Sequence, residues 1–230
     1  MATTFQRARN EEQRAVRRQA ILDTAAAMLT EMPVAQVSLN ELSRRVGLAK
    51  SNVLRYFESR EAVLLELLAA ASRELVEHLR TALPAAVDAD APVRERADQV
   101  AAAFVTAVAE RPVMCDLISA QAAVLERNVS PQVAADYKRT AIANAVALAQ
   151  LVATHIPELG ERDAMRFMAG AVMVTGAIWT HAHPSAAMEA AYAADPSLAA
   201  LRLDFAATLR ETLEVLLSGL LARASGQGRP

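Results

Sequence analysis

The chain has 230 residues, 53% of them hydrophobic, and a formal net charge of −2. Its single cysteine, Cys115, excludes an internal disulfide framework and a metal site built from several cysteines. Aromatic residues make up only 4% of the chain, alanine is abundant, and no stretch alternates apolar and polar residues as a half-buried strand would. We therefore expect an all-α protein.

The first expected helix covers residues 11–31. Its apolar residues recur at spacings of three and four, which places them on one buried stripe. The stripe consists of Val16, Ala20, Ile21, Ala25, Met28 and Leu29. Arg14, Arg17 and Arg18 lie elsewhere on the same helix. Pro33 helps to end the segment.

A second and a third helix are expected within residues 38–57. Ser38 precedes Glu41 by three positions, a capping-box pattern that opens a helix. Gly47 supplies the positive φ that ends this helix, and a short third helix follows. Two short helices joined at a glycine and supported by a first helix make a helix-turn-helix unit.

The third helix, expected over residues 50–57, buries little and is rich in polar groups. Val53 and Phe57 should face inward. Its lysine, arginine, asparagine and serine side chains can pair with phosphate or with base edges, and such a helix lies in the DNA major groove. The residues expected to contact DNA are Ser38, Arg44, Arg45, Lys50, Ser51, Asn52, Arg55, Tyr56 and Arg60.

Basic residues are concentrated at the N-terminal end. Residues 1–60 hold ten Lys or Arg against six Asp or Glu, a net of +4, whereas residues 61–230 hold fourteen against twenty, a net of −6. A basic head on an acidic body favours contact with a polyanion such as nucleic acid. A solvated charged face, or a helical hairpin with a purely structural role, is the alternative.

The remaining helices are separated by links that contain proline or glycine. A fourth helix restarts after Ser59, and residues 183–196 form a link with room for one short helix. The other expected helices cover residues 92–110, 112–126, 131–155, 162–182 and 196–223, which gives about nine to ten helices in all. The expected domains are a helix-turn-helix domain, residues 1–60, a helical second domain, residues 61–223, and a disordered tail, residues 224–230.

The stretch SLNELSRRVGLAKSNVLRYFESREAVLLELL resembles the DNA-binding domain of TetR/AcrR-family transcriptional regulators. The similarity covers about residues 12–70. It is most specific at Gly47, at the pair Tyr56-Phe57 and at the restart Ser59-Arg60-Glu61.

The chain departs from the family's pattern at three positions. Ala49 stands where the family usually has a helix-capping serine, Ser51 replaces a frequent glycine, and Leu54 replaces a common tyrosine. These changes leave the fold intact and leave the operator sequence open.

The resemblance implies a homodimer, usually a repressor, that a small molecule releases from a pseudo-palindromic operator in double-stranded DNA. It also implies that the last two long helices pair with their two-fold mates. A leucine row on the last helix and small residues within 162–182 agree with such pairing, although a core stripe within one chain is the alternative. The expected dimer interface comprises Ala169, Met173, Gly176, Leu201, Phe205, Leu209, Leu213, Leu216 and Leu220.

The resemblance places a ligand pocket among the fifth to eighth helices. Apolar walls with a few polar groups suit a small, mainly apolar effector. The candidate lining residues are Phe104, Met114, Cys115, Leu117, Ile118, Tyr137, Met173 and Trp179. Each is also a plausible core residue. A regulator with a filled second domain, acting without ligand or through a protein partner, is therefore the alternative function.

The sequence contains no enzyme motif and no metal-ligand set. Nucleophile motifs, glycine-rich phosphate loops and carboxylate–histidine sets at suitable spacing are lacking, so an all-α enzyme is a remote alternative. His181 and His183 are two positions apart and do not share a helix face, and we expect no metal and no cofactor. The most apolar run, residues 167–179, is shorter than the roughly 18 residues of a membrane span. We expect a cytoplasmic protein that does not contact membranes.

Overall fold

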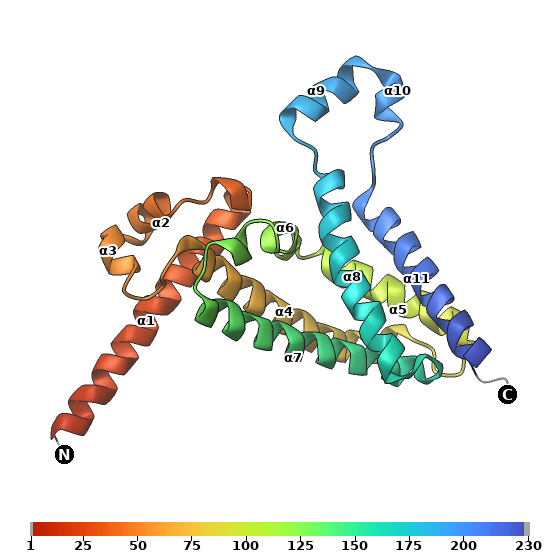
Figure 1. The fold of residues 1–230 in the computed structure, drawn as a ribbon, viewed down its shortest axis with the longest axis horizontal. Coiled ribbons are helices and arrows are strands. Elements are labelled where there is room, and N and C mark those ends of the chain that lie inside the picture. The colour runs from red at the N-terminus through yellow and green to blue at the C-terminus, as the bar shows by residue number, and fades with distance from the viewer. Residues whose placement is uncertain (1, 228–230) are drawn as a thin grey trace. The chain divides into compact units, whose positions relative to one another are not determined.

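A computed structural model describes residues 2–227, with side chains from residue 11 to residue 225. Within this range the chain forms eleven α-helices, three short 3-10 helices and no β-strand, which confirms the all-α prediction (Figure 1). In chain order the helices are α1 (Ala2–Glu31), η1 (Val34–Gln36), α2 (Leu39–Val46), α3 (Lys50–Val53), α4 (Arg60–Ala86), α5 (Val93–Ala109), α6 (Pro112–Gln121), η2 (Leu125–Arg127), α7 (Pro131–His155), η3 (Pro157–Leu159), α8 (Gly160–Ala182), α9 (Ala186–Ala194), α10 (Pro196–Ala199) and α11 (Phe205–Gln227).

The helices form two compact units. Unit 1 comprises Met1–Leu68 and Ala120–Tyr137, and unit 2 comprises Ala69–Ser119 and Lys138–Pro230. The boundary predicted at residue 60 coincides with the start of α4, but the first two turns of α4 belong to unit 1. An ion pair between Arg18 of α1 and Glu66 of α4 lies inside this unit.

In unit 1 the second half of α1 packs against the helix-turn-helix pair. Its buried residues are Ile21, Leu22, Ala25, Met28 and Leu29. The assignment of Val16 and Ala20 to this stripe is wrong, because Val16 is 65% exposed and Ala20 is also exposed. The N-terminal half of α1 extends away from α2 and α3 (Figure 1).

Unit 2 contains a core in which α11 packs along α5 and α8. Leu209, Leu213 and Leu217 of α11 are fully buried there. The segment between α8 and α11, residues 183–204, forms an arm that contains α9 and α10 and projects beyond the ends of both long helices (Figure 1). No residue of α9 or α10 is buried.

The last helix begins at Phe205 and not, as predicted, at residue 196. Asp195 caps the separate helix α10, accepting from the Ser197 N–H at 2.9 Å, and Asp204 caps α11, accepting from the Ala207 N–H at 2.7 Å. Two aspartate caps therefore divide one apolar stretch into two helices. At the other end α11 continues to Gln227, so residues 224–227 are helical and not a disordered tail, while residues 228–230 lie outside the described range.

Candidate nucleic-acid interface

A capped helix and a left-handed glycine form the helix-turn-helix. The Glu41 N–H donates to Oγ of Ser38 at 3.1 Å, as the capping pattern predicts. Gly47 has a φ of +71°, and the Leu48 N–H donates to the Ser43 carbonyl at 3.0 Å, which ends α2 in a Schellman turn. The turn places α3 directly against α2.

The helix α3 is shorter than predicted but is anchored as predicted. It ends at Val53, and the chain continues to Phe57 in turns. Ala49 provides no side-chain cap, which weakens the start of the helix. Val53 and Phe57 are buried, with exposures of 0% and 4%. The exposed side chains of the segment include Lys50, Ser51, Asn52 and Arg55.

Lys50 and Arg55 are unpaired cations on this surface. Within the described part of the chain, no hydrogen bond or ion pair involves either side chain. Tyr56, between Arg55 and the buried Phe57, is half-buried. An incoming phosphate can therefore pair with Lys50 or Arg55 without first breaking a contact inside the protein.

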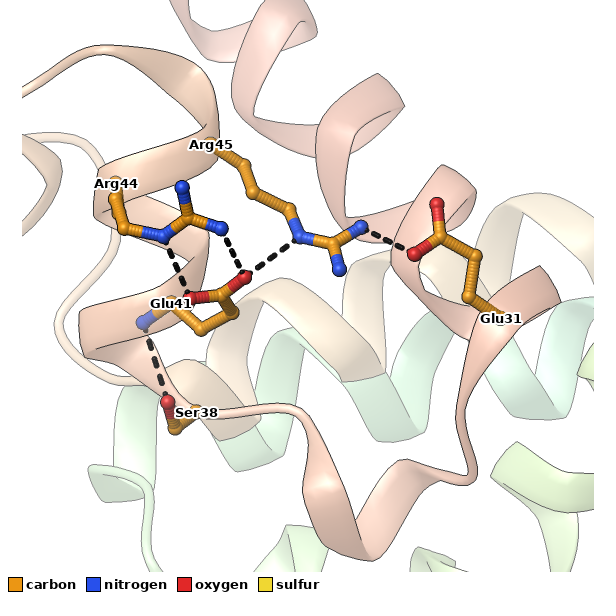
Figure 2. Close-up of polar contacts among 5 residues, drawn as sticks. All are labelled: Glu31, Ser38, Glu41, Arg44 and Arg45. Carbon is orange, nitrogen blue, oxygen red and sulfur yellow. Dashed lines mark hydrogen bonds and ion pairs between the residues drawn. The ribbon is translucent and has the colours of Figure 1, made fainter.

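Glu41 partly neutralises the two arginines at the end of α2 (Figure 2). Its carboxylate accepts from Nε and Nη2 of Arg44 at 2.9 and 2.7 Å and from Nε of Arg45 at 2.9 Å. Arg45 also pairs with Glu31 of α1 at 2.6 Å. The hydrogen bonds from Arg44, and then those from Arg45, lower the pKa of Glu41 from 4.5 to about 2. The carboxylate therefore stays ionised at neutral pH.

Arg60 was predicted to contact DNA, but it lies inside unit 1. Its Nη1 donates to the Val37 carbonyl at 2.7 Å, and its side chain is only 18% exposed. Nε lies 3.2 Å from the Glu61 carboxylate, an ion pair without a hydrogen bond. These contacts tie the start of α4 to the segment before α2.

Arg18 is a structural residue that the sequence analysis did not single out. Its Nη1 donates to the Tyr56 carbonyl at 3.0 Å, and its Nη2 pairs with Glu66. Its guanidinium carbon lies 4.1 Å from the centre of the Phe57 ring. Helical spacing contained the signal, because position 18 is three residues before Ile21 and therefore borders the buried stripe.

A hollow of about 260 Å³ lies between α1 and the end of the α3 segment. It is lined by Gln13, Arg14, Arg17, Arg55 and Tyr56, and we call it the basic notch. Arg14 and Arg17 are exposed and, like Arg55, have no ion pair within the described residues. The three guanidinium groups give the notch a concentrated positive charge.

Several predicted ligand residues are ordinary core residues of unit 2. The buried ones are Phe104, Met114, Cys115 and Leu117. The Cys115 thiol donates to the Val108 carbonyl at 3.5 Å, and burial raises its pKa to about 12. Because the thiolate is the reactive form, this cysteine is inert at neutral pH.

The other predicted ligand residues have different surroundings, each described within its own unit. Met173 is 70% exposed on the outer face of α8, so its assignment to a pocket within the chain is wrong. Tyr137 belongs to unit 1, and burial raises its pKa. Trp179 stacks on His183, with ring centres 3.7 Å apart, and meets Phe205 edge-on at 5.0 Å. Ile118 packs against α8.

Unit 2 contains a small apolar cavity and a larger open groove. The first encloses about 10 Å³ and has room for no more than about one water molecule. It is lined by Leu79, Leu83, Val100, Phe104, Leu148, Leu151, Val152 and Met168. The second is an open groove of about 690 Å³ between α7 and α8 with a mixed lining. Its apolar residues include Val146, Ala149, Ala153, Pro157 and Met165, and its polar ones are Gln150, Thr154, Glu161 and Arg162.

The predicted dimer residues divide into outward and inward groups. Ala169 and Met173 of α8 are exposed, and Leu201 is exposed on the arm rather than on the last helix. Phe205 and Leu216 are half-buried. The assignment of Leu209, Leu213 and Leu220 is wrong, because these side chains are buried within the chain's own core. The assignment of Gly176 to the dimer interface is wrong as well, because this residue is also buried.

Gly176 is buried where α8 meets α6. A Cβ atom at this position would lie 3.1 Å from Cγ2 of Ile118, so glycine permits the close approach of the two helices. A leucine row and small residues at helical spacing fit an internal contact as well as a dimer. The structure shows that much of this pattern belongs to the core.

Among residues with described side chains, no group of three or more His, Cys, Asp or Glu could hold a metal ion. His183 is oriented by a contact of its Nδ1 with the Trp179 carbonyl at 3.0 Å. No single described helix is long and apolar enough to cross a membrane. The helix α7 and the segment η3–α8 reach that length and apolar character only when taken together, and the chain bends by 112° between them.

Two family models match the sequence. Residues 21–67 match the model for bacterial regulatory proteins of the tetR family. Residues 69–224 match the model for the tetracyclin repressor-like C-terminal domain. No curated protein sequence gives a significant match.

Solved structures with the same fold cover nearly the whole chain. A possible TetR family transcriptional regulator from Streptomyces coelicolor A3(2) has a TM-score of 0.60 at 16% identity, covering 90% of this chain and 99% of its own. FadR from Bacillus subtilis, in complex with stearoyl-CoA, has a TM-score of 0.55 at 16% identity, covering 87% of this chain and 98% of its own. A TetR transcriptional regulator from Rhodococcus sp. RHA1 has a TM-score of 0.54 at 15% identity, covering 92% of this chain and 97% of its own.

At this level of identity the solved structures show the fold alone, whereas the two family models show the family. They confirm an N-terminal helix-turn-helix followed by a helical C-terminal domain. Proteins of this kind are transcription factors and not enzymes. The chain belongs to the TetR family of transcriptional regulators.

Proposed function

We propose that the protein is a sequence-specific DNA-binding repressor. It acts as a homodimer and is released from a pseudo-palindromic operator by a small, mainly apolar ligand. The observation that carries the proposal is the exposed polar row of the α3 segment, which consists of Lys50, Ser51, Asn52 and Arg55. The buried side chains of Val53 and Phe57 anchor this segment to the core of unit 1.

Each group of this row has a counterpart on DNA. With α3 in the major groove, the Asn52 amide can pair with adenine, and Lys50 or Arg55 can pair with guanine or phosphate. The start of α2, capped by Ser38, offers free N–H groups to a backbone phosphate. Arg44, exposed at the other end of α2, adds positive charge.

Arg45 and Arg60 have supporting roles in this proposal. Both side chains are largely covered, and both are engaged with other parts of unit 1. They hold α2 and α4 in place, so that the groups on α3 meet DNA in a fixed arrangement.

The outer faces of α8 and α11 support the homodimer. Met173 and Val215 are 70% and 67% exposed, and Ala169 lies one turn from Met173 on the same side of α8. Large apolar side chains at such exposure favour contact with another surface. A two-fold dimer would place two α3 helices in successive major grooves, about 34–36 Å apart.

The effector in this proposal is a small, mainly apolar molecule. The FadR structure contains stearoyl-CoA, a ligand with a long apolar acyl chain. The apolar residues of the groove between α7 and α8, such as Val146 and Met165, offer such an acyl chain an accessible surface. To change operator occupancy from nearly complete to nearly none, a ligand must prefer the released state by about 5 kcal/mol.

A regulator without a ligand is the second candidate. The observation in its favour is the space around Phe104, which the surrounding side chains fill almost completely. Stearoyl-CoA added to the protein–operator complex separates the two. Release at concentrations that leave the protein folded supports the ligand-controlled repressor, and unchanged binding across fatty acyl-CoAs and free fatty acids supports the second candidate.

Selection of bound fragments from genomic DNA at about 150 mM salt tests the DNA-binding function. We expect a pseudo-palindromic motif whose half-sites lie one helical turn apart. Arg55→Ala should weaken binding to this motif by roughly 5- to 150-fold, the range for the loss of one good base contact. Arg94→Ala, an exposed arginine of α5, is the matched control.

Three results would argue against the proposal. These are the absence of an enriched motif from a folded protein, equal effects of Arg55→Ala and Arg94→Ala, and an affinity that does not change with salt.

A further inference from the structure

We propose that the basic notch binds a DNA backbone phosphate outside the base pairs that α3 contacts. Arg14 and Arg17 of α1 would hold this phosphate together with Arg55 and Tyr56. The proposal rests on the proposed DNA-binding function. It adds a contact from a helix that is not part of the helix-turn-helix pair.

The charge of the notch points to an anion. Three guanidinium groups line a hollow of about 260 Å³, together with the Gln13 amide and the Tyr56 side chain, and no carboxylate is among the lining residues. Like charges held together repel one another unless an anion lies between them. A phosphate accepts paired hydrogen bonds from a guanidinium fork and a further one from a hydroxyl.

Shared residues connect the notch to the DNA-binding surface. Arg55 belongs both to the exposed row of α3 and to the notch lining. A strand whose bases meet α3 therefore carries its own backbone past the notch. This continuity favours a phosphate of duplex DNA over a free anion or an acidic peptide.

The position of Arg14 and Arg17 on α1 fits this role. They are three residues apart, so they lie on one side of the helix. They precede the buried stripe, which begins at Ile21, and Val16 between them is exposed. The adjacent Arg18 is engaged inside unit 1, where it donates to the Tyr56 carbonyl and pairs with Glu66. Arg14 and Arg17 therefore add nothing to the core of unit 1, but they place two cations beside Arg55.

The contact would be independent of base sequence. It should raise affinity for any duplex that extends past the motif, and it should leave the selected motif unchanged. It should also add to the salt dependence, because each neutralised phosphate releases counterions.

The test compares the full-length double variant R14A/R17A with R73A/R94A. The control removes two exposed arginines from unit 2 and changes the net charge equally. Affinity is measured across salt concentrations on a duplex with long flanks and on one trimmed to the motif. On the long duplex we expect R14A/R17A to lower the slope of log K against log salt by about 2. Each half of the dimer loses one phosphate contact, and each contact contributes about 0.9 to the slope. On the trimmed duplex its slope should equal that of the wild type.

Conservative variants separate charge from folding. R14K/R17K should keep most of the slope, and thermal melting of R14A/R17A should match the wild type because both side chains are exposed. An unchanged slope on the long duplex or an altered motif would overturn the proposal. A wild type that selects no motif would remove the proposed function itself, a result that differs from both.

Discussion

The arginines of unit 1 look alike in the sequence but have different neighbours in the structure. Arg55 has no ion pair among the described residues, whereas Arg44 and Arg45 share Glu41. Arg18 and Arg60 each donate to a backbone carbonyl. At the scale of the residue, the role of a cation therefore depends on which acceptor the fold brings to it.

Glu41 should limit the affinity of the protein for DNA. Its carboxylate competes with phosphate for Arg44 and Arg45, so Glu41→Gln should raise affinity for duplexes of any sequence by roughly two- to tenfold at low salt. Fluorescence anisotropy with unrelated duplexes measures this effect. Glu77→Gln, an exposed glutamate of unit 2, makes the same charge change, and an equal gain from it would refute a local effect.

The same residue predicts a pH dependence of folding stability. The Glu41 pKa falls from 4.5 to about 2 on folding, so ionised Glu41 favours the folded state above pH 4.5. This contribution should be lost as the pH falls from 4.5 toward 2. A titration of the Glu41 carboxyl carbon by NMR measures the pKa directly, and a midpoint near 4.5 would contradict the arginine contacts.

At the scale of the element, local sequence signals predicted the cap, the turn and the inward residues of the helix-turn-helix. The Ser38 cap, the left-handed Gly47 and the inward pair Val53 and Phe57 are all where the sequence predicts them. Each depends on residues within a few positions of one another. The length of α3 was overestimated because Phe57 is buried from a turn as well as it would be from a helix.

The outward and inward sides of long helices were harder to predict. Val16 fits the apolar stripe of α1 by spacing, and Leu213 fits a dimer seam on α11 by spacing. Which side is covered depends on where the neighbouring helices end and which side they occupy. That information comes from contacts far apart in the chain, such as those of α11 with α5.

Arg18 should hold three elements of unit 1 together. Arg18→Ala removes the hydrogen bond to the Tyr56 carbonyl, the ion pair with Glu66 and the contact with the Phe57 ring. We expect the free energy of unfolding to fall by about 1–2 kcal/mol, because the pair is partly exposed to solvent. Urea denaturation measures this change, and the exposed neighbour Arg17→Ala should stay within about 0.5 kcal/mol. Equal losses from the two variants would exclude the proposed role.

At the scale of the whole molecule, the outer face of α8 should control assembly. Met173→Asp leaves the fold intact because the side chain is 70% exposed, but it places two like charges near the two-fold axis of the proposed dimer. The dimer dissociation constant should rise by roughly tenfold or more. Analytical ultracentrifugation measures it, with Ile142→Asp, another exposed apolar residue, as the control. A Met173→Asp protein that sediments like the wild type would place the interface elsewhere.

The arm at residues 183–204 has a separate consequence. Its internal contacts are polar or local, with Arg202 paired to Glu189 and stacked 5.4 Å from the centre of the Tyr192 ring, and neither of its helices has a buried residue. Beyond His183, which packs on Trp179, the arm therefore adds little to the core, and α8 and α11 remain in contact by their own packing. Chain length and sequence are free to drift here at little cost in folding. The arm is thus the part of unit 2 where a foreign peptide could be inserted, or the backbone cut, with the core left standing.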